Sequence, residues 1–119
     1  MKIKTAIYFC SDDGERFFGE GPYRLLKGIQ ATGSLRSAAQ QMGIAYTKAF
    51  SVLKRAETEF GFALTQRQIG GKGGGGSVLT EQAKQLVESY EQYKSACEQQ
   101  SRAEYQHYFQ QPYFPPQVE

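Results

Sequence analysis

A helical row of polar and basic side chains is the strongest chemical signal in this sequence of 119 residues. The row follows Gly43 and lies on the face of an expected helix opposite its apolar residues. Donor groups at the start of such a helix can reach base edges in the DNA major groove, whereas cations further along suit phosphates. We therefore expect base contacts from the first four of these residues and phosphate contacts from the last two: Tyr46, Thr47, Lys48, Ser51, Lys54 and Arg55.

The residues around this helix start have the pattern of a helix-turn-helix. The small Ala39 stands four residues before Gly43, and Val52 stands nine residues after it. Helices that cross closely need a small residue, a sharp turn needs glycine, and apolar residues then hold the second helix on the first. Two short helices can match this pattern by chance. Ser34 and Arg36, at the start of the helix that precedes Gly43, are further expected DNA contacts.

A strand, a glycine-rich loop and a returning strand follow, which is typical of a wing. The expected wing covers residues 62–79, with GGKGGGG (residues 70–76) at its tip. Arg67 and Lys72 would contact the DNA backbone there. The alternative is a hairpin tip without a role. A phosphate-binding P-loop is excluded because Lys72 is followed by Gly73 and the position six before it is Gln66.

The distribution of charge favours this interpretation, although the net charge of +2 alone argues against a nucleic-acid binder. Residues 22–79 hold eight basic and two acidic residues, a net charge of +6. Residues 1–21 hold three basic and four acidic residues, and residues 80–119 hold three and six. The positive charge therefore lies on the expected DNA-binding unit, as phosphate contact requires.

The remaining pattern predicts a mainly α fold with a little β-structure. A β-hairpin is expected over residues 1–18, with its turn at residues 11–14, and Pro22 is expected to be the first residue of a helix. Ser34 and Gly61 are expected to begin the second helix and end the third. The expected buried residues of the three helices are Leu25, Leu26 and Ile29, then Leu35, Ala38, Ala39 and Met42, then Ala49, Val52, Leu53, Ala56 and Phe60.

A long last helix is expected over residues 80–104, after a winged helix-turn-helix domain at residues 1–79 and before an irregular aromatic, Gln- and Pro-rich tail at residues 105–119. Its apolar and polar seam repeats at heptad spacing. We favour a homodimer interface over packing of this helix on its own domain. The domain at residues 1–79 is too small to cover the whole length of the helix. The seam consists of Ala83, Leu86, Tyr90, Tyr93, Cys97 and Gln100.

Other classes of function find little support. Cys10, Cys97 and the single His107 can build neither a disulfide framework nor a zinc site, and no cofactor is expected. An enzyme is the weakest hypothesis because no nucleophile has a partner base. No apolar run is long enough for a signal peptide or a membrane span, so we expect a cytoplasmic protein without membrane contact.

Residues 19–95 resemble the DNA-binding head of ModE-type molybdate-responsive regulators and, more distantly, the winged-helix head of LysR-type regulators. The most specific segments are ATGSLRSAA, AYTKAF and GGKGGGG leading into LT. The resemblance implies a bacterial winged helix-turn-helix regulator that is dimeric through its last helix and reads a palindromic operator. It places Tyr46, Thr47, Lys48 and Ser51 in the recognition helix, and Lys72 in the wing.

Three departures from the family are visible. Ala45 stands where related heads often have Ser, so a capping hydroxyl is lost, and Phe50 stands where the family tends to have Trp. We expect Phe50 to pack against the wing or the first helix rather than to contact a thymine methyl. The resemblance does not extend to the molybdate-binding domains of full-length ModE, so it does not carry molybdate sensing to this chain.

Two alternatives stay open. The chain could be a protein–protein adaptor that keeps the fold and binds partners through the aromatic residues of its tail, which are Tyr105, Tyr108, Phe109, Tyr113 and Phe114. A pocket for a small effector between the head and the last helix is also compatible with the sequence, and nothing in the sequence demonstrates one.

Overall fold

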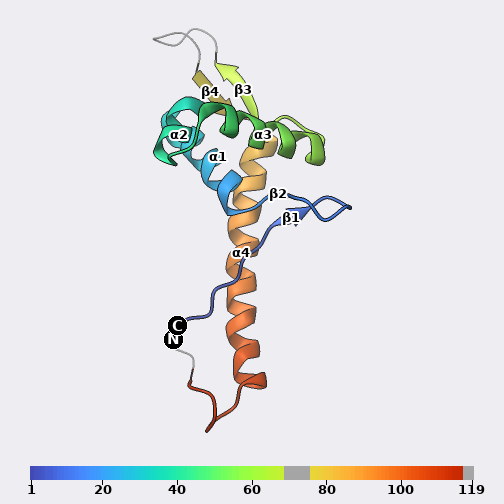
Figure 1. Cartoon of the computed structure of the whole chain (residues 1–119), viewed down its shortest axis with the longest axis vertical. Coiled ribbons are helices and arrows are strands. Elements are labelled where there is room, and N and C mark those ends of the chain that lie inside the picture. Colours follow the sequence, from blue (N-terminus) through green and yellow to red (C-terminus); the bar gives the residue numbers. More distant parts are fainter. Residues whose placement is uncertain (69–75, 117–119) are drawn as a thin grey trace.

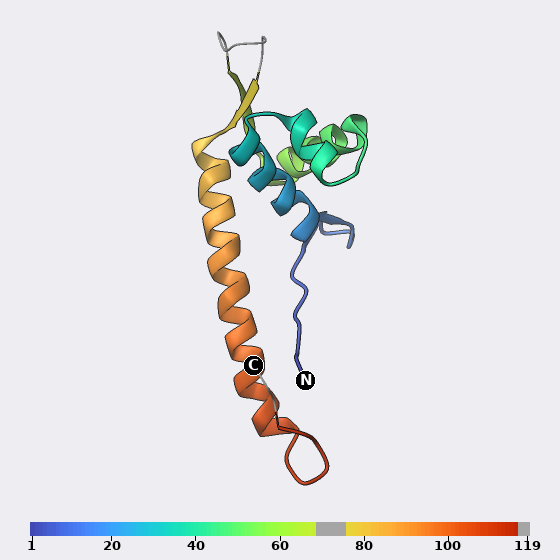
Figure 2. The ribbon, with the colours of Figure 1, turned by 90° about the vertical axis from the view of Figure 1, so that its left-hand side faces the viewer.

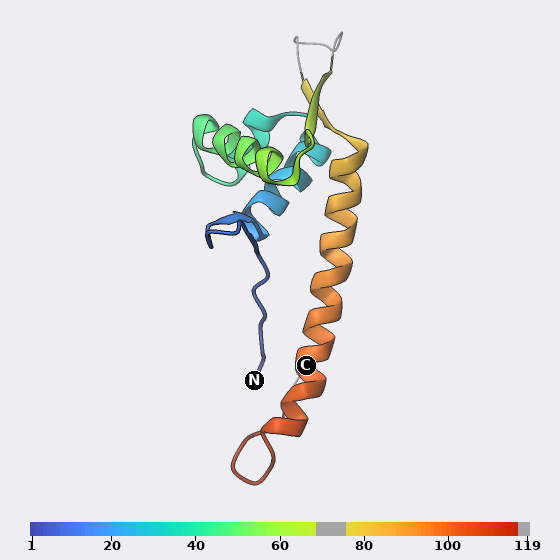
Figure 3. The same ribbon diagram turned by 90° about the vertical axis from the view of Figure 1, so that its right-hand side faces the viewer.

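The computed structural model describes residues 1–68 and 76–116, which form four helices and two small antiparallel sheets. Three helices gather at one end of the fourth (Figure 1). Figures 2 and 3 show that these three lie on one side of α4, which extends far beyond them. The shape is correspondingly long, with extents of 63 × 31 × 25 Å. The helices are α1 (Glu20–Thr32), α2 (Leu35–Gln41), α3 (Tyr46–Phe60) and α4 (Glu81–Tyr108).

Local signals set most of the helix ends. The Ser34 hydroxyl accepts a hydrogen bond of 3.1 Å from the Ser37 N–H, which confirms Ser34 as the cap of α2. Gly33 and Gly61 end α1 and α3 at φ angles of 73° and 82°, where a side chain would be strained. We expected Pro22 to be the first residue of α1, but it is the third. Proline is tolerated there because the first N–H groups of a helix lack partners within it.

The turn between α2 and α3 is tight. Gly43 has a φ of 69°, and the Ile44 N–H donates to the Ala39 carbonyl at 3.0 Å. At the crossing of α1 and α2, a Cβ on Gly28 would lie only 2.8 Å from the Ala38 Cβ. The close approach of α1 and α2 therefore depends on Gly28, a residue that the sequence pattern did not single out; the pattern predicted the small Ala39 at the crossing of α2 with α3.

The core holds the expected apolar faces of the first three helices. Leu25, Leu26 and Ile29 of α1 are buried, as are Ala49, Leu53 and Ala56 of α3. Ala38 and Ala39 of α2 are buried as well. The remaining expected core residues are half-buried against this cluster: Leu35, Met42, Val52 and Phe60.

The N-terminal hairpin is real but much shorter than expected. It pairs β1 (Phe9–Cys10) with β2 (Arg16–Phe18), and residues 1–8 form no strand. Its aromatic rings pack on the end of α3, where the Phe60 ring lies 5.8 Å from Phe9 and 5.1 Å from Phe17 between centroids. This cluster fixes the hairpin against the helix that carries the candidate site.

The wing consists of β3 (Thr65–Gln68) and β4 (Gly76–Leu79), paired from Thr65 opposite Leu79 to Gln68 opposite Gly76. It begins at Thr65 rather than at the expected residue 62, because Phe62 instead stacks on Phe60 at 5.4 Å. The Ser77 N–H donates to the Gly33 carbonyl at 2.8 Å, which joins the wing to the end of α1. The tip at residues 69–75, including Lys72, lies outside the described residues.

Helix α4 begins as expected, with the Thr80 hydroxyl accepting from the Ala83 N–H at 3.0 Å. It ends at Tyr108 and not at residue 104, so the irregular tail begins at Phe109. Tyr105 is buried because the tail folds back over it. Its hydroxyl donates to the Pro115 carbonyl at 2.6 Å, and its ring stacks on Phe109 at 5.1 Å.

The expected dimer seam is wrong for Ala83 and Tyr90, which are buried in the core of their own chain. The Tyr90 hydroxyl donates to the Ile7 carbonyl at 3.0 Å, and its ring stands perpendicular to Phe18 at 5.4 Å. Leu86 and Cys97 are half-buried, whereas Tyr93 is 57% exposed. The first half of α4 thus packs on its own head. No helix among the described residues is long and apolar enough to cross a membrane.

Candidate nucleic-acid interface

The outward face of α3 presents the polar residues expected there. Ala49, Leu53 and Ala56 are buried on the opposite face. Ala45 precedes the helix without a capping side chain, so the first N–H groups of α3 receive no hydroxyl from it. The structure therefore brings together on one accessible surface five of the six residues that we predicted on this helix: Tyr46, Thr47, Lys48, Ser51 and Lys54.

Two stacked rings with a cation at each end form a row along one edge of this face. The guanidinium of Arg36 on α2 lies 4.5 Å from the Tyr46 ring centroid, and the Tyr46 ring stacks on Phe50 at 6.3 Å. The Lys54 ammonium lies 5.3 Å from the Phe50 ring. Each cation lies within the range of attraction to a ring face. We call these four residues, Arg36, Tyr46, Phe50 and Lys54, the cation–aromatic row.

The position of Phe50 corrects our expectation that it packs against the wing or the first helix. Its side chain is 45% exposed and contacts its helical neighbours in the row instead. The i, i+4 spacing of Tyr46, Phe50 and Lys54 was the sequence signal for this arrangement, because residues at that spacing are neighbours on a helix.

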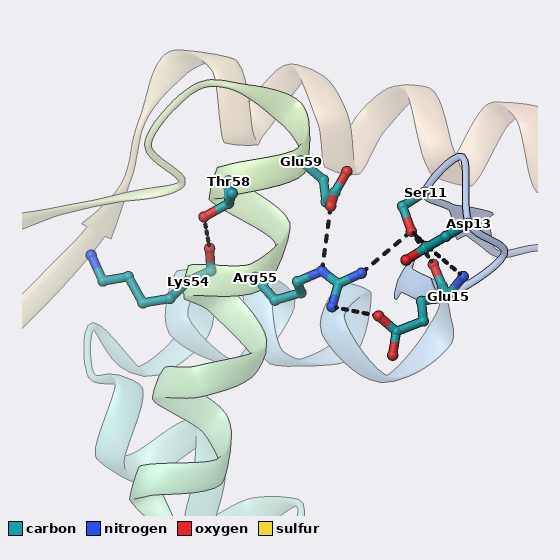
Figure 4. A network of polar contacts seen from close by, with 7 residues as sticks. All are labelled: Ser11, Asp13, Glu15, Lys54, Arg55, Thr58 and Glu59. Carbon is teal, nitrogen blue, oxygen red and sulfur yellow. Dashed lines mark hydrogen bonds and ion pairs between the residues drawn. The ribbon is translucent and has the colours of Figure 1, made fainter.

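Arg55 differs from the other basic residues of α3, since its side chain turns toward the hairpin (Figure 4). Its guanidinium lies 3.3 Å from the Glu15 carboxylate and 3.6 Å from that of Glu59. It also donates to the Ser11 hydroxyl at 3.4 Å. Two carboxylates already neutralise this cation, so its phosphate contact stays a prediction for which the geometry offers less support than for Lys54.

The remaining predicted contacts lie around α2 and the wing. The half-buried Ser34 hydroxyl accepts a hydrogen bond in capping α2, which leaves its proton to donate to a phosphate. Arg67 is exposed on β3. Lys54 pairs with Glu57 at 3.2 Å, and Glu57 in turn accepts from the Leu64 N–H at 2.7 Å, which ties α3 to the segment leading into the wing.

Hydrogen bonds shift the pKa values of several groups that hold the site together. The Ser11 hydroxyl lowers the pKa of Asp13 in the hairpin turn. Between α1 and α4, burial and the hydrogen bond to Glu91 raise the pKa of Tyr23 to about 12. The same hydrogen bond lowers the pKa of Glu91, with help from Lys27 at 3.3 Å. These groups position the helices and lie away from the outward face of α3.

The described residues contain no group of three His, Cys, Asp or Glu side chains that could hold a metal ion. Cys10 is exposed, Cys97 is half-buried, and both thiols are free.

Comparison with known proteins points to regulators of transcription, although no protein-family model matches the chain. It is 40% identical over 67 residues to the transcriptional regulator ModE of Yersinia pestis, covering 56% of this chain and 26% of that protein. It is 37% identical over 67 residues to the DNA-binding transcriptional dual regulator ModE of Escherichia coli K12, with the same coverage. The molybdenum transport protein ModE of Herbaspirillum seropedicae is 40% identical over 73 residues, which are 61% of this chain and 25% of that protein.

The chain thus spans about a quarter of the length of the curated relatives it matches. Among solved structures, a LysR family transcriptional regulator superposes with a TM-score of 0.53 at 13% identity, covering 76% of this chain and 29% of that one. At that identity the likeness concerns the fold, a winged helix-turn-helix with a long helix after the wing. In sequence, this chain is therefore similar to part of the ModE regulators, and in fold it resembles the winged helix of the LysR family regulator.

Proposed function

We propose that this chain is a sequence-specific DNA-binding module of a transcriptional regulator. The observation that carries the proposal is the outward face of α3, where five polar and basic side chains are exposed on a helix held rigidly by its buried alanines and Leu53. The charge of residues 22–79 is +6, which suits a polyanionic partner. The relatives that are named as transcriptional regulators, one of them as DNA-binding, support the same function.

In this proposal α3 enters the major groove. Thr47, Lys48 and Ser51 read base edges near its start, while Lys54 contacts phosphate further along. Arg36 approaches the same surface from α2 because its guanidinium is held over the Tyr46 ring. The wing contacts the flanking backbone through Arg67 and Lys72. Ser34 adds a backbone contact at the start of α2.

We further propose that the module acts as a homodimer through the distal half of α4. This half extends past the head (Figure 1), and Tyr93 at its beginning is largely exposed. With Ala83 and Tyr90 buried in their own chain, the interface consists of Tyr93, Cys97 and Gln100, with Leu86 at its edge. Tyr93→Glu should convert dimers to monomers in sedimentation, whereas Gln99→Glu on another face of α4 should not. Wild-type protein that is monomeric at all concentrations contradicts this part.

The function is tested by fluorescence anisotropy with labelled duplex DNA over a range of salt concentrations. We expect affinity to fall steeply as salt rises, because bound phosphates release counterions. Lys72→Ala should weaken binding to all sequences alike, whereas Thr47→Ala or Lys48→Ala should change the sequence preference. No duplex binding at low salt would overturn the proposal. If Lys72→Ala changed the sequence preference without weakening binding overall, the proposed role of the wing would be wrong.

A second candidate function is that of a protein–protein adaptor. The observation in its favour is the exposed aromatic surface at the end of the chain, where Tyr113 is 88% exposed and Tyr108 and Phe114 are also accessible. Removal of residues 109–119 discriminates between the two functions. An adaptor would lose its partner in a pulldown, whereas the DNA-binding module would keep its affinity for duplex DNA.

A further inference from the structure

A groove of about 860 Å³ lies beside α3, between the N-terminal segment, the hairpin and the start of α1. This volume is in the range of small-molecule sites, roughly 300–1,000 Å³. Its apolar lining includes Ile7 and Phe17 from the N-terminal part of the chain and Val52 from α3. Such a lining can bury an aromatic or branched aliphatic body.

The charged lining of this groove is strongly unbalanced. Five cations line it, which are Lys4, Arg16, Lys48, Arg55 and Lys94, against the single carboxylate of Glu20. Lys94 pairs with Glu20 at 3.0 Å, and Arg55 pairs with carboxylates of the hairpin and α3. Arg16 lies 3.7 Å from the centre of the Tyr8 ring.

Lys4 and Lys48 have neither an ion pair nor a ring contact among the residues that the structure describes, whereas Arg16 has its contact with the Tyr8 ring. The groove therefore joins apolar walls to two available ammonium groups, one from the N-terminal segment and one from α3.

Lys48 and Ser51 belong to two surfaces at once. They line the groove, and they are also among the residues proposed to read base edges. Val52 and Arg55 follow them along the same flank of α3, because residues three and four apart lie side by side on a helix. An anion seated in the groove would compete with DNA for the Lys48 ammonium group.

We propose that this groove binds a small organic anion, a carboxylate or sulfonate with an aromatic or branched body, and that its occupant competes with DNA. The apolar body lies against Ile7, Phe17 and Val52, and the anionic group lies between Lys4 and Lys48. The competition rests on the proposed DNA-binding function, whereas the anion site itself does not. Residues of α3 line the groove, so an occupant would contact the proposed recognition helix directly.

The site is tested with the fluorescent probe 1-anilinonaphthalene-8-sulfonate, using its neutral analogue N-phenyl-1-naphthylamine as the control ligand. We expect saturable binding of the anionic probe that Lys4→Gln and Lys48→Gln each weaken by roughly threefold, as loss of one partly exposed ion pair predicts. Lys2→Gln makes the same charge change in the same segment outside the groove and should leave binding unchanged. Val52→Trp, which fills the groove, should weaken both probes. Equal affinity of wild type, Lys4→Gln and Lys48→Gln for the anionic probe would overturn the site.

The competition is tested by adding duplex DNA to the complex of the full chain with the sulfonate probe. Displacement of the probe at DNA concentrations that saturate the protein supports the proposal. Formation of a ternary complex, with the probe retained on DNA-bound protein, overturns the competition. A chain that binds the probe in the charge-dependent way but binds no duplex contradicts the proposed DNA function and leaves the anion site supported, so the two failures are distinguishable.

Discussion

The guanidinium of Arg55 lies 3.3 Å from the carboxylate of Glu15, and this ion pair joins the turn of the N-terminal hairpin to the middle of α3. The two residues are 40 positions apart in the sequence. Glu59 and Ser11 complete the network around the same guanidinium (Figure 4). The hairpin therefore supports the helix that we propose to read DNA, and Arg55 serves first to hold the two together.

This arrangement separates the roles of two neighbouring cations. Arg55→Ala should lower the free energy of unfolding by about 1 kcal/mol, since partly exposed ion pairs contribute little individually. It should change the slope of log affinity against log salt less than Lys54→Ala does, because two carboxylates already neutralise Arg55. Lys54→Ala should reduce the steepness of that slope by about 0.9, the value for one lost phosphate contact. Anisotropy titrations and urea unfolding measure both. The account is wrong about this pair if Arg55→Ala alters the salt slope and Lys54→Ala does not.

We expect the Phe50 side chain to make an apolar contact with DNA and to add little to the stability of the core. Because its side chain is 45% exposed, Phe50→Ala should change stability by less than about 0.5 kcal/mol. It should weaken binding to a preferred duplex roughly fourfold, the value of about 0.8 kcal/mol for one buried methyl group. Replacing thymine by deoxyuridine in that duplex removes the methyl groups. The wild type should lose affinity on this replacement, and Phe50→Ala should be indifferent to it. If both proteins lose the same affinity on this replacement, Phe50 does not contact a thymine methyl group.

The crossing of α1 and α2 should tolerate no Cβ at Gly28. Gly28→Ala places a methyl group 2.8 Å from the Ala38 Cβ, so one helix must move, and we expect a loss of about 1–3 kcal/mol. Gly21→Ala is the matched control on the same helix, because its Cβ would meet nothing within 4 Å. It should be neutral or stabilising by up to about 1 kcal/mol. Urea unfolding measures both changes, and equal effects of the two substitutions would show that the crossing is not tight.

The hydrogen bond between Tyr23 and Glu91 should make stability depend on acid pH. The pKa of Glu91 is lowered in the folded chain, so its contribution is complete above the ordinary value of 4.5 and is lost as pH falls through the folded value. Tyr23→Phe should therefore destabilise the chain at pH 7, by about 0.5–1 kcal/mol for a half-exposed pair. The difference from wild type should shrink at pH 3. Thermal melting at both pH values measures it, with the exposed Tyr113→Phe as the control. A difference that grows on acidification would contradict the assignment.

Sequence patterns predicted the parts of the fold that depend on local chemistry. Ser34 caps its helix through its own hydroxyl, and Gly43 and Gly61 take the left-handed conformations that turns and helix ends require. The buried faces of α1 and α3 followed from helical periodicity. The exposed face of α3 followed as well, because it is the complement of the buried one.

The patterns failed where a residue's partner lies far away in the sequence. A heptad seam does not tell whether Tyr90 meets a second chain or its own, and here it meets Ile7 and Phe18. Helix α4 continues to Tyr108 because the tail covers Tyr105, a contact that no local signal announces. The pairing of Arg55 with Glu15 likewise depends on how the hairpin folds onto α3.

The central claim, that the exposed face of α3 reads DNA sequence, is tested most directly by selecting bound duplexes from a random pool with the wild-type chain and with Thr47→Ala. We expect the wild type to enrich a palindrome whose half-sites lie about one helical turn apart, roughly 10 base pairs, and Thr47→Ala to enrich a different half-site in the same spacing. The same enriched sequence from both proteins, or no enrichment by the wild type at low salt, would contradict the account.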